Sequence, residues 1–379
     1  MGGGSGGHIT PIVAVIGELK KRAPTAELRV WTDKKFALQA RQMLGGAARV
    51  DVIASGKLRR YANLKWWYKY FSWYHISKTH WPNFVDAFKI VGGFGQSFAK
   101  LLRWRPNVVF CKGGFVGLPV GLAAHLLKIP LVIHDSDTVP GLTNRVLARW
   151  ACAIGTGAPI ENYPNYDPKI TRFIGIPVRP EFRKLSARQK AAAKKLFKLD
   201  ADKPLVLAIG GGGGAREINE TVLQIAPELV RGGAQIFIVA GKNGRDNLAA
   251  PIPAGVTVAD FVSDDMARLL GAADVVVTRA GATFLAELAA VGAAAIIVPS
   301  PYLAGDHQTK NAAVYEKAGA AVVLNQKALA QNPEILAREI IKLLNDKNLR
   351  EKLGKNLAKF AKPDALAAMA DLILKAVQK

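Results

Sequence analysis

His8 is the residue whose type and position most directly suggest chemistry. It ends the segment Gly-Gly-Gly-Ser-Gly-Gly-His at residues 2–8, and the pattern of residues 9–21 predicts a helix directly after it. The pKa of histidine lies close to physiological pH, so an imidazole placed here could take a proton from an incoming hydroxyl group. The alternative is a histidine that caps the helix or packs beneath the loop.

The glycines before His8 predict an anion-binding site. Backbone N–H groups at a helix N-terminus are unpaired, the helix dipole adds positive potential, and missing side chains allow close approach. The pattern of a second such segment, AIGGGGGAREIN at residues 208–219, predicts the end of a strand, then a run of five glycines, then a helix. Neither segment is a clean GxGxxG with an acidic residue about 20 positions further on, and neither has the GK[ST] of a P-loop, which disfavours a dinucleotide oxidoreductase and an ATPase. Both segments could instead be tight turns that pack a strand on a helix.

Residues 278–292, TRAGATFLAELAAVG, form a third candidate turn before a helix. Glu287 lies inside this predicted helix between apolar neighbours. A carboxylate there could accept both hydroxyls of a ribose while the helix N-terminus holds the attached phosphates. The alternative is an ordinary surface glutamate.

Residues 305–321, GDHQTKNAAVYEKAGAA, form a fourth candidate turn. Gln308 and Asn311 are three positions apart, so a helix places them on one face. Amides both donate and accept hydrogen bonds, which suits them to the hydroxyl groups of a sugar. The alternative is ordinary helix capping by Asp306.

An aromatic and basic segment at residues 57–81 holds four of the seven tryptophans. Trp and Tyr beside Lys and Arg are typical of a membrane interface, where the rings lie at head-group depth and the cations meet anionic lipid. We therefore expect an anionic membrane surface as a partner; a nucleic-acid surface and a packing or oligomer surface are the alternatives. The residues assigned to this contact are Trp66, Trp67, Tyr70, Phe71, Trp73 and Tyr74.

Composition limits the class of protein. The 379 residues carry a formal net charge of +23, which favours phosphorylated substrates, an anionic membrane or nucleic acid as partners. Cys111 and Cys152 cannot form a disulfide framework, and they indicate a reducing compartment. We find no secretory signal and no apolar run of about 18 residues that would span a membrane.

Short apolar runs alternate with amphipathic runs along the whole chain, which predicts parallel sheets with helical crossovers. The expected strands are residues 27–32, 106–112, 130–134, 171–177, 203–211, 234–241, 255–262, 273–279 and 293–299. The alternation occurs twice, so we predict two Rossmann-like domains with a boundary near residues 177–180. A glycine loop normally follows a strand, yet only Met1 precedes Gly2. We therefore expect the first strand to be missing, either because the true start lies upstream or because the sheet lacks it.

In their order and spacing these motifs resemble the MurG family of glycosyltransferases. The resemblance rests on GGGSGGHITP, CKGGFVGLPVGLAA (111–124), the HD…PGLTN segment (134–144), GIPVR (175–179), GGGGGAREIN, DFVSDDM (260–266), TRAGATFLAELAAVG and HQTKNA (307–312). It implies an α/β fold of the GT-B type, with two Rossmann-like domains facing across a cleft. Residues 1–178 would form the acceptor and membrane-facing domain, residues 179–355 the UDP-sugar domain, and residues 356–379 a helix that returns to the first domain.

The resemblance also implies an activity. The family transfers N-acetylglucosamine, with inversion and without a metal or cofactor, from UDP-N-acetylglucosamine to the undecaprenyl-diphospho-N-acetylmuramoyl-pentapeptide of peptidoglycan synthesis. It acts at the cytoplasmic face of the bacterial plasma membrane, and no nucleic-acid partner is expected. The alternatives are another UDP-sugar enzyme of this fold with a different lipid acceptor, a UDP-sugar epimerase and, further away, a dinucleotide oxidoreductase or a nucleic-acid binder.

Site residues follow from the matching positions. His8 resembles the base for the acceptor hydroxyl, Arg179 a residue near the donor phosphates, and Glu287 the ribose ligand. Val262 resembles the residue whose backbone reads uracil. The residues expected to bind UDP-N-acetylglucosamine are Ser5, Gly6, Gly7, Asp137, Arg179, Gly212, Phe261, Val262, Ala282, Thr283, Phe284, Leu285, Ala286, Glu287, Gln308 and Asn311. The chain departs from the usual family pattern at Asp137, Ile176, Gly212 and Phe284.

Overall fold

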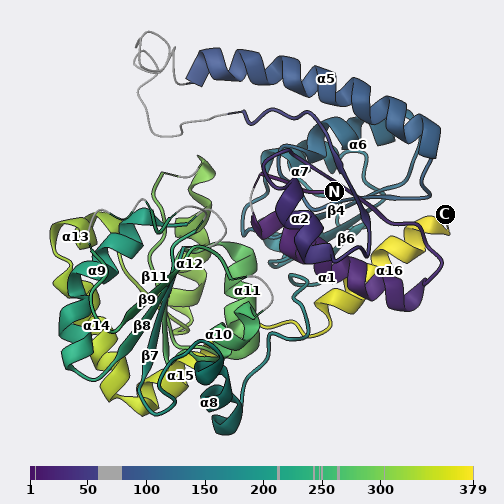
Figure 1. Ribbon diagram of the computed structural model, residues 1–379. Coiled ribbons are helices and arrows are strands. Elements are labelled where there is room, and N and C mark those ends of the chain that lie inside the picture. Colours follow the sequence, from purple (N-terminus) through teal and green to yellow (C-terminus); the bar gives the residue numbers. More distant parts are fainter. Residues whose placement is uncertain are drawn as a thin grey trace. The chain divides into compact units, whose positions relative to one another are not determined.

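The computed structural model describes residues 1–4, 6–58, 79–210, 214–241, 244–246, 248, 251–262, 265–302 and 304–378. The chain divides into two compact units, each described here by itself (Figure 1). The first unit comprises Met1–Pro177 together with Asp364–Lys379, and the second comprises Val178–Pro363. We expected the chain to return to the first unit at residue 356. It begins at Asp364 instead, because Leu357 is buried in the core of the second unit.

The first unit alternates strands and helices. Its elements are α1 (Gly6–Arg22), β1 (Arg29–Thr32), α2 (Ala37–Leu44), β2 (Arg49–Val52), α5 (Trp81–Trp104), β3 (Val109–Cys111), α6 (Gly117–Leu126), β4 (Leu131–Asp135), α7 (Leu142–Leu147), β5 (Ala153–Thr156), the 3₁₀ turn η2 (Ile160–Asn162), β6 (Thr171–Phe173) and α16 (Ala365–Val377). Strands β1 and β2 form one parallel pair, and β3-β4-β5-β6 form a parallel sheet in that order. The β1–β2 pair and the four-stranded sheet are joined by the first two residues of the chain.

Met1 and Gly2 lie where the missing first strand was expected. The backbone N–H of Gly2 donates to the carbonyl of Trp31 in β1 at 3.2 Å, and the carbonyl of Met1 accepts from the N–H of Lys112 beyond β3 at 2.9 Å. The terminal amine of Met1 donates to Phe110 at 2.6 Å. These two residues therefore bridge β1 and β3 with main-chain hydrogen bonds.

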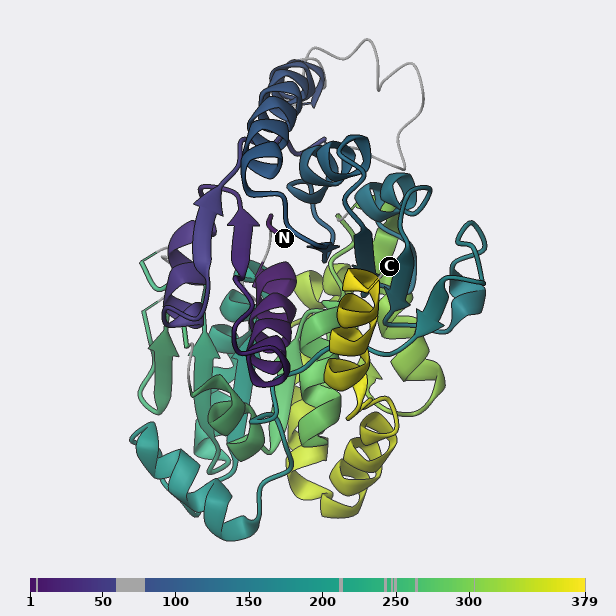
Figure 2. The ribbon, with the colours of Figure 1, turned by 90° about the vertical axis from the view of Figure 1, so that its right-hand side faces the viewer.

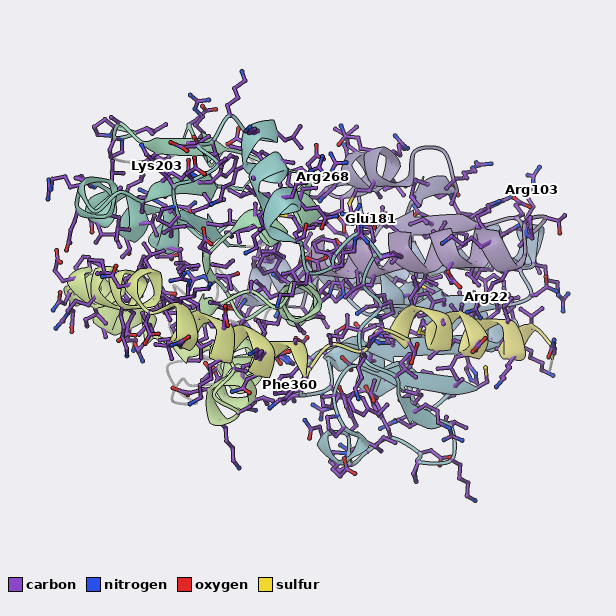
Figure 3. The ribbon with its side chains drawn as sticks, turned by 90° about the horizontal axis from the view of Figure 1, so that it is seen from below. Arg22, Arg103, Glu181, Lys203, Arg268 and Phe360 are labelled. Atoms are coloured by element: carbon purple, nitrogen blue, oxygen red, sulfur yellow. The ribbon has the colours of Figure 1, made fainter. Side chains whose placement is uncertain are left out.

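Helices cover both faces of this unit. Leu131 and Ile133 of β4 point into the core beneath α6 and α7, whereas Val132 packs against α1 and α16. This alternation is the period of two expected of a buried strand. Figure 2 shows α1 and α16 side by side, and Figure 3 labels Arg22 next to α16. An ion pair of 2.6 Å between Arg22 and Asp371 joins the two helices. The N-terminal helix is thus fixed by the last helix of the chain.

The second unit is a parallel sheet in the order β12-β11-β10-β7-β8-β9. Its elements are α8 (Ala187–Leu196), β7 (Leu205–Ile209), α9 (Arg216–Arg231), β8 (Gln235–Val239), β9 (Val256–Ala259), α10 (Met266–Ala272), β10 (Val275–Thr278), α11 (Ala282–Val291), β11 (Ala295–Ile297), η3 (Ala304–Asp306), α12 (His307–Lys317), β12 (Val322–Val323), α13 (Gln326–Gln331), α14 (Glu334–Asn345) and α15 (Lys347–Ala358). Figure 1 shows α9, α13 and α14 on one face of the sheet and α10, α11 and α12 on the other. Every residue of β7 is buried, with Leu205 and Leu207 in one core and Val206 in the other.

The predicted α/β class with parallel sheets is confirmed. All expected strands form; β4 has the expected length but is shifted by one residue, and the others are shorter than predicted. Strands β2, β5 and β12 were not predicted; β2 has the sequence RVDV with no fully buried residue, so it lacks an apolar signal. Within the described part of the chain, no helix is both long and apolar enough to cross a bilayer.

Candidate active site

Polar side chains gather where the strands of the first unit end. Strands β1, β3 and β4 end at Thr32, Cys111 and Asp135, and ligands of parallel α/β sheets bind at this edge. The segments just beyond these strand ends carry Asp33, Lys112, Ser136 and Asp137. The carboxylate of Asp33 accepts the N–H of Gly4 at 2.8 Å, so it anchors the glycine segment that precedes α1.

His8 lies in the first turn of α1, because the helix begins at Gly6. Its ring packs over Gly114, which has a φ of +78°; a Cβ atom there would lie 3.2 Å from the His8 ring and 2.3 Å from the carbonyl of Gly3. Only glycine fits this position. The Nδ1 atom of His8 is buried and has no hydrogen-bond partner among the described residues. An orphaned buried polar atom is rare in a folded protein, and here it stands at a candidate functional residue.

Burial sets the protonation state of His8. Burial and, to a smaller extent, the nearby Lys112 cation lower the pKa of His8, while Asp137 and a hydrogen bond with the main chain of Lys112 oppose this, and the resulting pKa is about 4. The imidazole is therefore neutral at physiological pH. A neutral imidazole has a lone pair with which to accept a proton.

Lys112 and Asp135, at the ends of β3 and β4, are both buried. The Lys112 side chain is 2% exposed, and its ammonium donates to the hydroxyl of Ser136. Asp135 accepts from the hydroxyl of Tyr166 at 2.9 Å and from the N–H of Gly141 at 3.0 Å. Burial lowers the pKa of Lys112 to about 8 and raises the pKa of Asp135 to about 6. Both shifts have the sign expected when water is removed from a charged group.

Hydrogen bonds fix the segment between β4 and α7. The ring nitrogen Nε2 of His134 lies 2.8 Å from the carbonyl of Gly175, and the amide of Asn144 donates to the carbonyl of His134 at 3.0 Å. Burial lowers the pKa of His134 well below its usual value, so the ring is neutral and carries one proton. Because Nε2 faces a carbonyl oxygen, which can only accept, Nε2 carries that proton and donates. The hydroxyl of Tyr163 donates to the carbonyl of Asp137 at 2.6 Å. These bonds hold the backbone of residues 134–137 in one conformation.

In the second unit, the turn between β10 and α11 presents a helix N-terminus. Gly281 precedes α11 in an extended conformation, and a Cβ atom added there would meet nothing within 4 Å. Thr283 and Leu285 are buried, whereas Ala282, Phe284 and Ala286 are half-buried. The helix N-terminus thus faces open space, as an anion site requires.

Glu287 lies further along α11 and is 6% exposed. Burial raises its pKa to about 8, and the positive charge of Arg179 partly offsets this. Arg179 also lies over the ring of Phe182, 5.3 Å from its centre. At neutral pH the Glu287 carboxyl group is mostly protonated, so it can both donate and accept a hydrogen bond.

Side chains from several elements hold this turn in place. Arg279 is buried and donates to Glu217 at 2.8 Å, to the carbonyl of Val298 at 3.2 Å and to Gln326. The expected sugar-reading residues also bind main chain here. Asn311 donates to the carbonyl of Ala280 at 3.1 Å, and Gln308 accepts from the N–H of Ser300 at 2.8 Å. The Asn311 amide therefore helps to shape this turn, and the Gln308 amide holds the segment after β11.

Phe261 and Val262 follow β9 at the same edge of the sheet. Val262 packs against the core, whereas the Phe261 ring is 45% exposed. Ser5, Gly212 and the six aromatic residues between positions 66 and 74 lie outside the described residues. Of the remaining expected donor-site residues, Gly6, Gly7 and Asp137 belong to the first unit and the others to the second.

Lys112, Asp135 and Arg279 were not among the predicted site residues. Each stands at or directly after the end of a buried strand of a parallel sheet. A charged residue directly after an apolar run is a signal that a sequence offers, because the strand end is where such sheets bind ligands. Asp135 and its neighbours in the sequence could have been found in this way.

We predict that Glu287→Gln flattens the dependence of stability on pH. The unfolded carboxyl group has an ordinary pKa of 4.5 and the folded one a pKa of about 8. The protonated form thus contributes stability that is complete below pH 4.5 and is lost as pH rises through about 8. Thermal unfolding at pH 5 and pH 8.5 should show the variant gaining a few kcal/mol over wild type at the higher pH, on the order expected for a shift of this size. The exposed Glu316→Gln is the control, and equal pH dependence in wild type and Glu287→Gln would contradict the prediction.

Known proteins resemble the chain over its whole length. Models of the glycosyltransferase family 28 N-terminal and C-terminal domains match residues 1–156 and 205–369. A relative from Caldicellulosiruptor saccharolyticus, named UDP-N-acetylglucosamine--N-acetylmuramyl-(pentapeptide) pyrophosphoryl-undecaprenol N-acetylglucosamine transferase, is 32% identical over 96% of this chain and 93% of its own.

Solved structures also resemble the chain over its whole length. The crystal structure of Acinetobacter baumannii MurG has a TM-score of 0.66 at 26% identity, covering 99% of this chain and 97% of its own. A UDP-GlcNAc 2-epimerase from Neisseria meningitidis, bound to UDP-GlcNAc, has a TM-score of 0.67 at 13% identity over 98% of each chain, which shows a shared fold alone. The chain therefore belongs to glycosyltransferase family 28, has the GT-B fold, and is a member of the MurG family within it.

Proposed function

We propose that this chain transfers N-acetylglucosamine from UDP-N-acetylglucosamine to an undecaprenyl-diphospho-N-acetylmuramoyl-pentapeptide in peptidoglycan synthesis. The observation that carries the proposal is the open N-terminus of α11 in front of Gly281, with a buried carboxyl group on the same helix. A helix N-terminus can bind the diphosphate and a carboxyl group can bind the ribose hydroxyls, so the combination suits a nucleoside diphosphate. The names of the full-length relatives support the identity of the sugar and of the acceptor.

The donor would lie along the strand-end edge of the second unit. The diphosphate meets the N–H groups at the start of α11 and the guanidinium of Arg179, which supply positive potential. Glu287 bonds the ribose hydroxyls, and Val262 with the exposed ring of Phe261 meets the uracil. The other second-unit residues in this proposal are Gly212, Ala282, Thr283, Phe284, Leu285, Ala286, Gln308 and Asn311. Ser5, Gly6, Gly7 and Asp137, which we also propose as donor-binding residues, belong to the first unit.

The proposed reaction is a single displacement with inversion. The acceptor oxygen attacks the anomeric carbon from the face opposite UDP, and the bond from that carbon to the diphosphate oxygen breaks. His8 takes the proton that the acceptor hydroxyl loses, for which its neutral state is required. Charge that develops on the departing UDP is stabilised by the α11 N-terminus and Arg179.

Helix α5 supports a membrane partner. Trp81, Phe84, Phe88 and Val91 recur at helical spacing and are between 56% and 68% exposed. The rings of Phe84 and Phe88 lie 5.0 Å apart. Figure 1 shows α5 as a long helix at the outer side of the first unit. We propose that this apolar stripe, together with residues 66–74, docks on the anionic cytoplasmic face of the plasma membrane.

The proposed base is tested by His8→Ala. Loss of an acid–base group should lower kcat for transfer to a lipid-linked acceptor by roughly 10²–10⁴, with an unchanged unfolding temperature. His125→Ala is the matched control, because that exposed imidazole only stacks on Trp150. Near-normal turnover of His8→Ala would remove His8 from this role.

Gly281→Ala tests the donor site. The extended backbone accepts alanine and the added methyl meets no protein atom, so the fold should be unaffected. The methyl would occupy the space in front of the helix N-terminus, so we expect KM for UDP-N-acetylglucosamine to rise at least ~10-fold, a loss of about 1.4 kcal/mol, and stabilisation by UDP to weaken. Gly17→Ala, which also meets no atom within 4 Å, should change neither. Unchanged donor affinity in Gly281→Ala would place the diphosphate elsewhere.

Membrane docking is tested with Phe84→Ser combined with Phe88→Ser. Each buried Phe contributes about 2 kcal/mol, so co-sedimentation with vesicles of anionic lipid should fall by at least ~10-fold. Leu38→Ser removes an equally exposed apolar side chain from α2 and should leave binding intact. Equal sedimentation of both variants and wild type would exclude the stripe as the membrane contact.

A further inference from the structure

Arg279 is a buried cation that takes no part in the reaction proposed so far. It directly follows β10 and comes two residues before Gly281, the residue that precedes α11. Its side chain is 8% exposed, and removing a guanidinium from water is costly unless the group is paired. The hydrogen bonds that offset this cost show what the residue does.

The order of the sheet places Arg279 between two other strand ends. Thr278, the last residue of β10, pairs with Ile209 of β7 on one side and with Ile297 of β11 on the other. Neighbouring parallel strands end at one edge of a sheet. The residue after β10 therefore lies between the segment that leads from β7 to α9 and the segment that follows β11.

The guanidinium of Arg279 is bonded to three different elements. It donates to the carbonyl of Val298 beyond β11 at 3.2 Å and to the amide oxygen of Gln326 at the start of α13. A third bond, of 2.8 Å, goes to the carboxylate of Glu217 in the first turn of α9. Because the donors of a guanidinium form a rigid, planar fork, these three bonds fix the place of the group.

Asn311 holds the same turn from the other face of the sheet. Its amide on α12 donates to the carbonyl of Ala280, the residue after Arg279. Figure 1 shows α9 and α13 on one face of the sheet and α12 on the other. The main chain that leads into α11 is thus held from both faces, and Arg279 links it to α9 and α13.

Glu217 is a charged group of the wrong sign for an anion site. Its side chain is 55% exposed, and it stands where α9 begins at the strand-end edge. On charge alone, a carboxylate at this edge opposes the binding of a diphosphate. A glutamate in the first turn also interacts favourably with the helix dipole, which would stabilise α9 without any effect on the donor. Its bond to Arg279 gives it a different role.

We propose that Arg279 is a positioning residue for the donor and that Glu217 holds it in place. The pair sets the turn between β10 and α11 where the N–H groups of α11 meet the diphosphate, and neither side chain touches the donor. This inference rests on the proposed function, which places the diphosphate at the N-terminus of α11.

Charge and position predict opposite signs for Glu217→Ala. If charge alone acts, removing a carboxylate near an anion site strengthens the binding of the anion. If Glu217 acts through Arg279, its loss releases one arm of the guanidinium and the turn shifts, so the affinity for UDP falls. The sign of the change therefore separates positioning from repulsion.

Calorimetric titration of the full chain with UDP measures this sign. We expect the Kd for UDP to rise at least ~3-fold in Glu217→Ala, on the scale of one modest hydrogen bond. Glu220→Ala is the matched control, because it removes a carboxylate from the same helix, where its partner is Arg216 at 2.7 Å. Its Kd should fall or stay unchanged. Glu217→Gln keeps an oxygen that accepts from Arg279 and should recover most of the affinity.

Arg279→Lys gives a second measurement, because it keeps the charge and removes the fork. One ammonium cannot reproduce three bonds of fixed geometry, so we expect KM for UDP-N-acetylglucosamine to rise by about 10-fold. KM for the lipid-linked acceptor should stay within about 2-fold, the pattern expected when only donor binding is lost. Arg268→Lys, an exposed arginine paired with Asp265 at 3.1 Å, is the control and should change neither.

Two results would overturn the inference. One is a Kd for UDP in Glu217→Ala that is equal to or lower than that of wild type. The other is a donor KM in Arg279→Lys equal to that of Arg268→Lys, even with a lower unfolding temperature, since the role would then be structural alone. If Arg279→Lys fails to fold by near-UV circular dichroism, the half-exposed Glu217→Ala decides.

The two proposals fail in different ways. Wild-type protein that binds UDP but transfers no N-acetylglucosamine refutes the proposed reaction, while the titrations still show whether Glu217 and Arg279 position the diphosphate. Normal binding and transfer by wild type, with unchanged UDP affinity in Glu217→Ala and unchanged donor KM in Arg279→Lys, refutes the inference alone.

Discussion

The main-chain hydrogen bonds of Met1 and Gly2 are the constraint on which the first unit depends. They join the β1–β2 pair to the sheet that begins with β3, and they do so with two residues in place of a whole strand. Because α1 begins four residues later, these bonds also fix the place of His8. The contact of Gly114 with Gly3 and the His8 ring then has a single geometry.

Both units concentrate buried ionisable groups at their strand ends. Lys112, Asp135 and Glu287 all have pKa values shifted toward the neutral form, and burial is the first cause in each case. Such groups reduce the stability of the folded state, which is why they are uncommon in ordinary cores. Their immediate neighbours belong to the apolar cores, Tyr166 beside Asp135 and Leu285 and Leu288 beside Glu287, so packing alone does not account for ionisable side chains at these positions.

The sequence predicted the α/β class and the strands rich in β-branched residues, because apolar runs bounded by glycine are a strong signal. It did not predict β2, whose RVDV sequence has no buried face, or β12, which is only two residues long. At the site, the type of Glu287 and its apolar neighbours indicated burial correctly. The main-chain bonds of Asn311 could not be predicted, because they depend on how α12 meets the β10–α11 turn. Lys112 was missed because its neighbours in space, Ser136 and His8, are far from it in sequence.

The packing of α16 on α1 has a consequence for synthesis of the chain. Val15, Leu19 and Val132 are covered by Met369, Ala370 and Ile373, which follow the whole second unit in the sequence. A ribosome releases all of the second unit before it releases this cover. The nascent first unit therefore exposes this apolar surface until α16 has been translated, and its assembly cannot be completed before then.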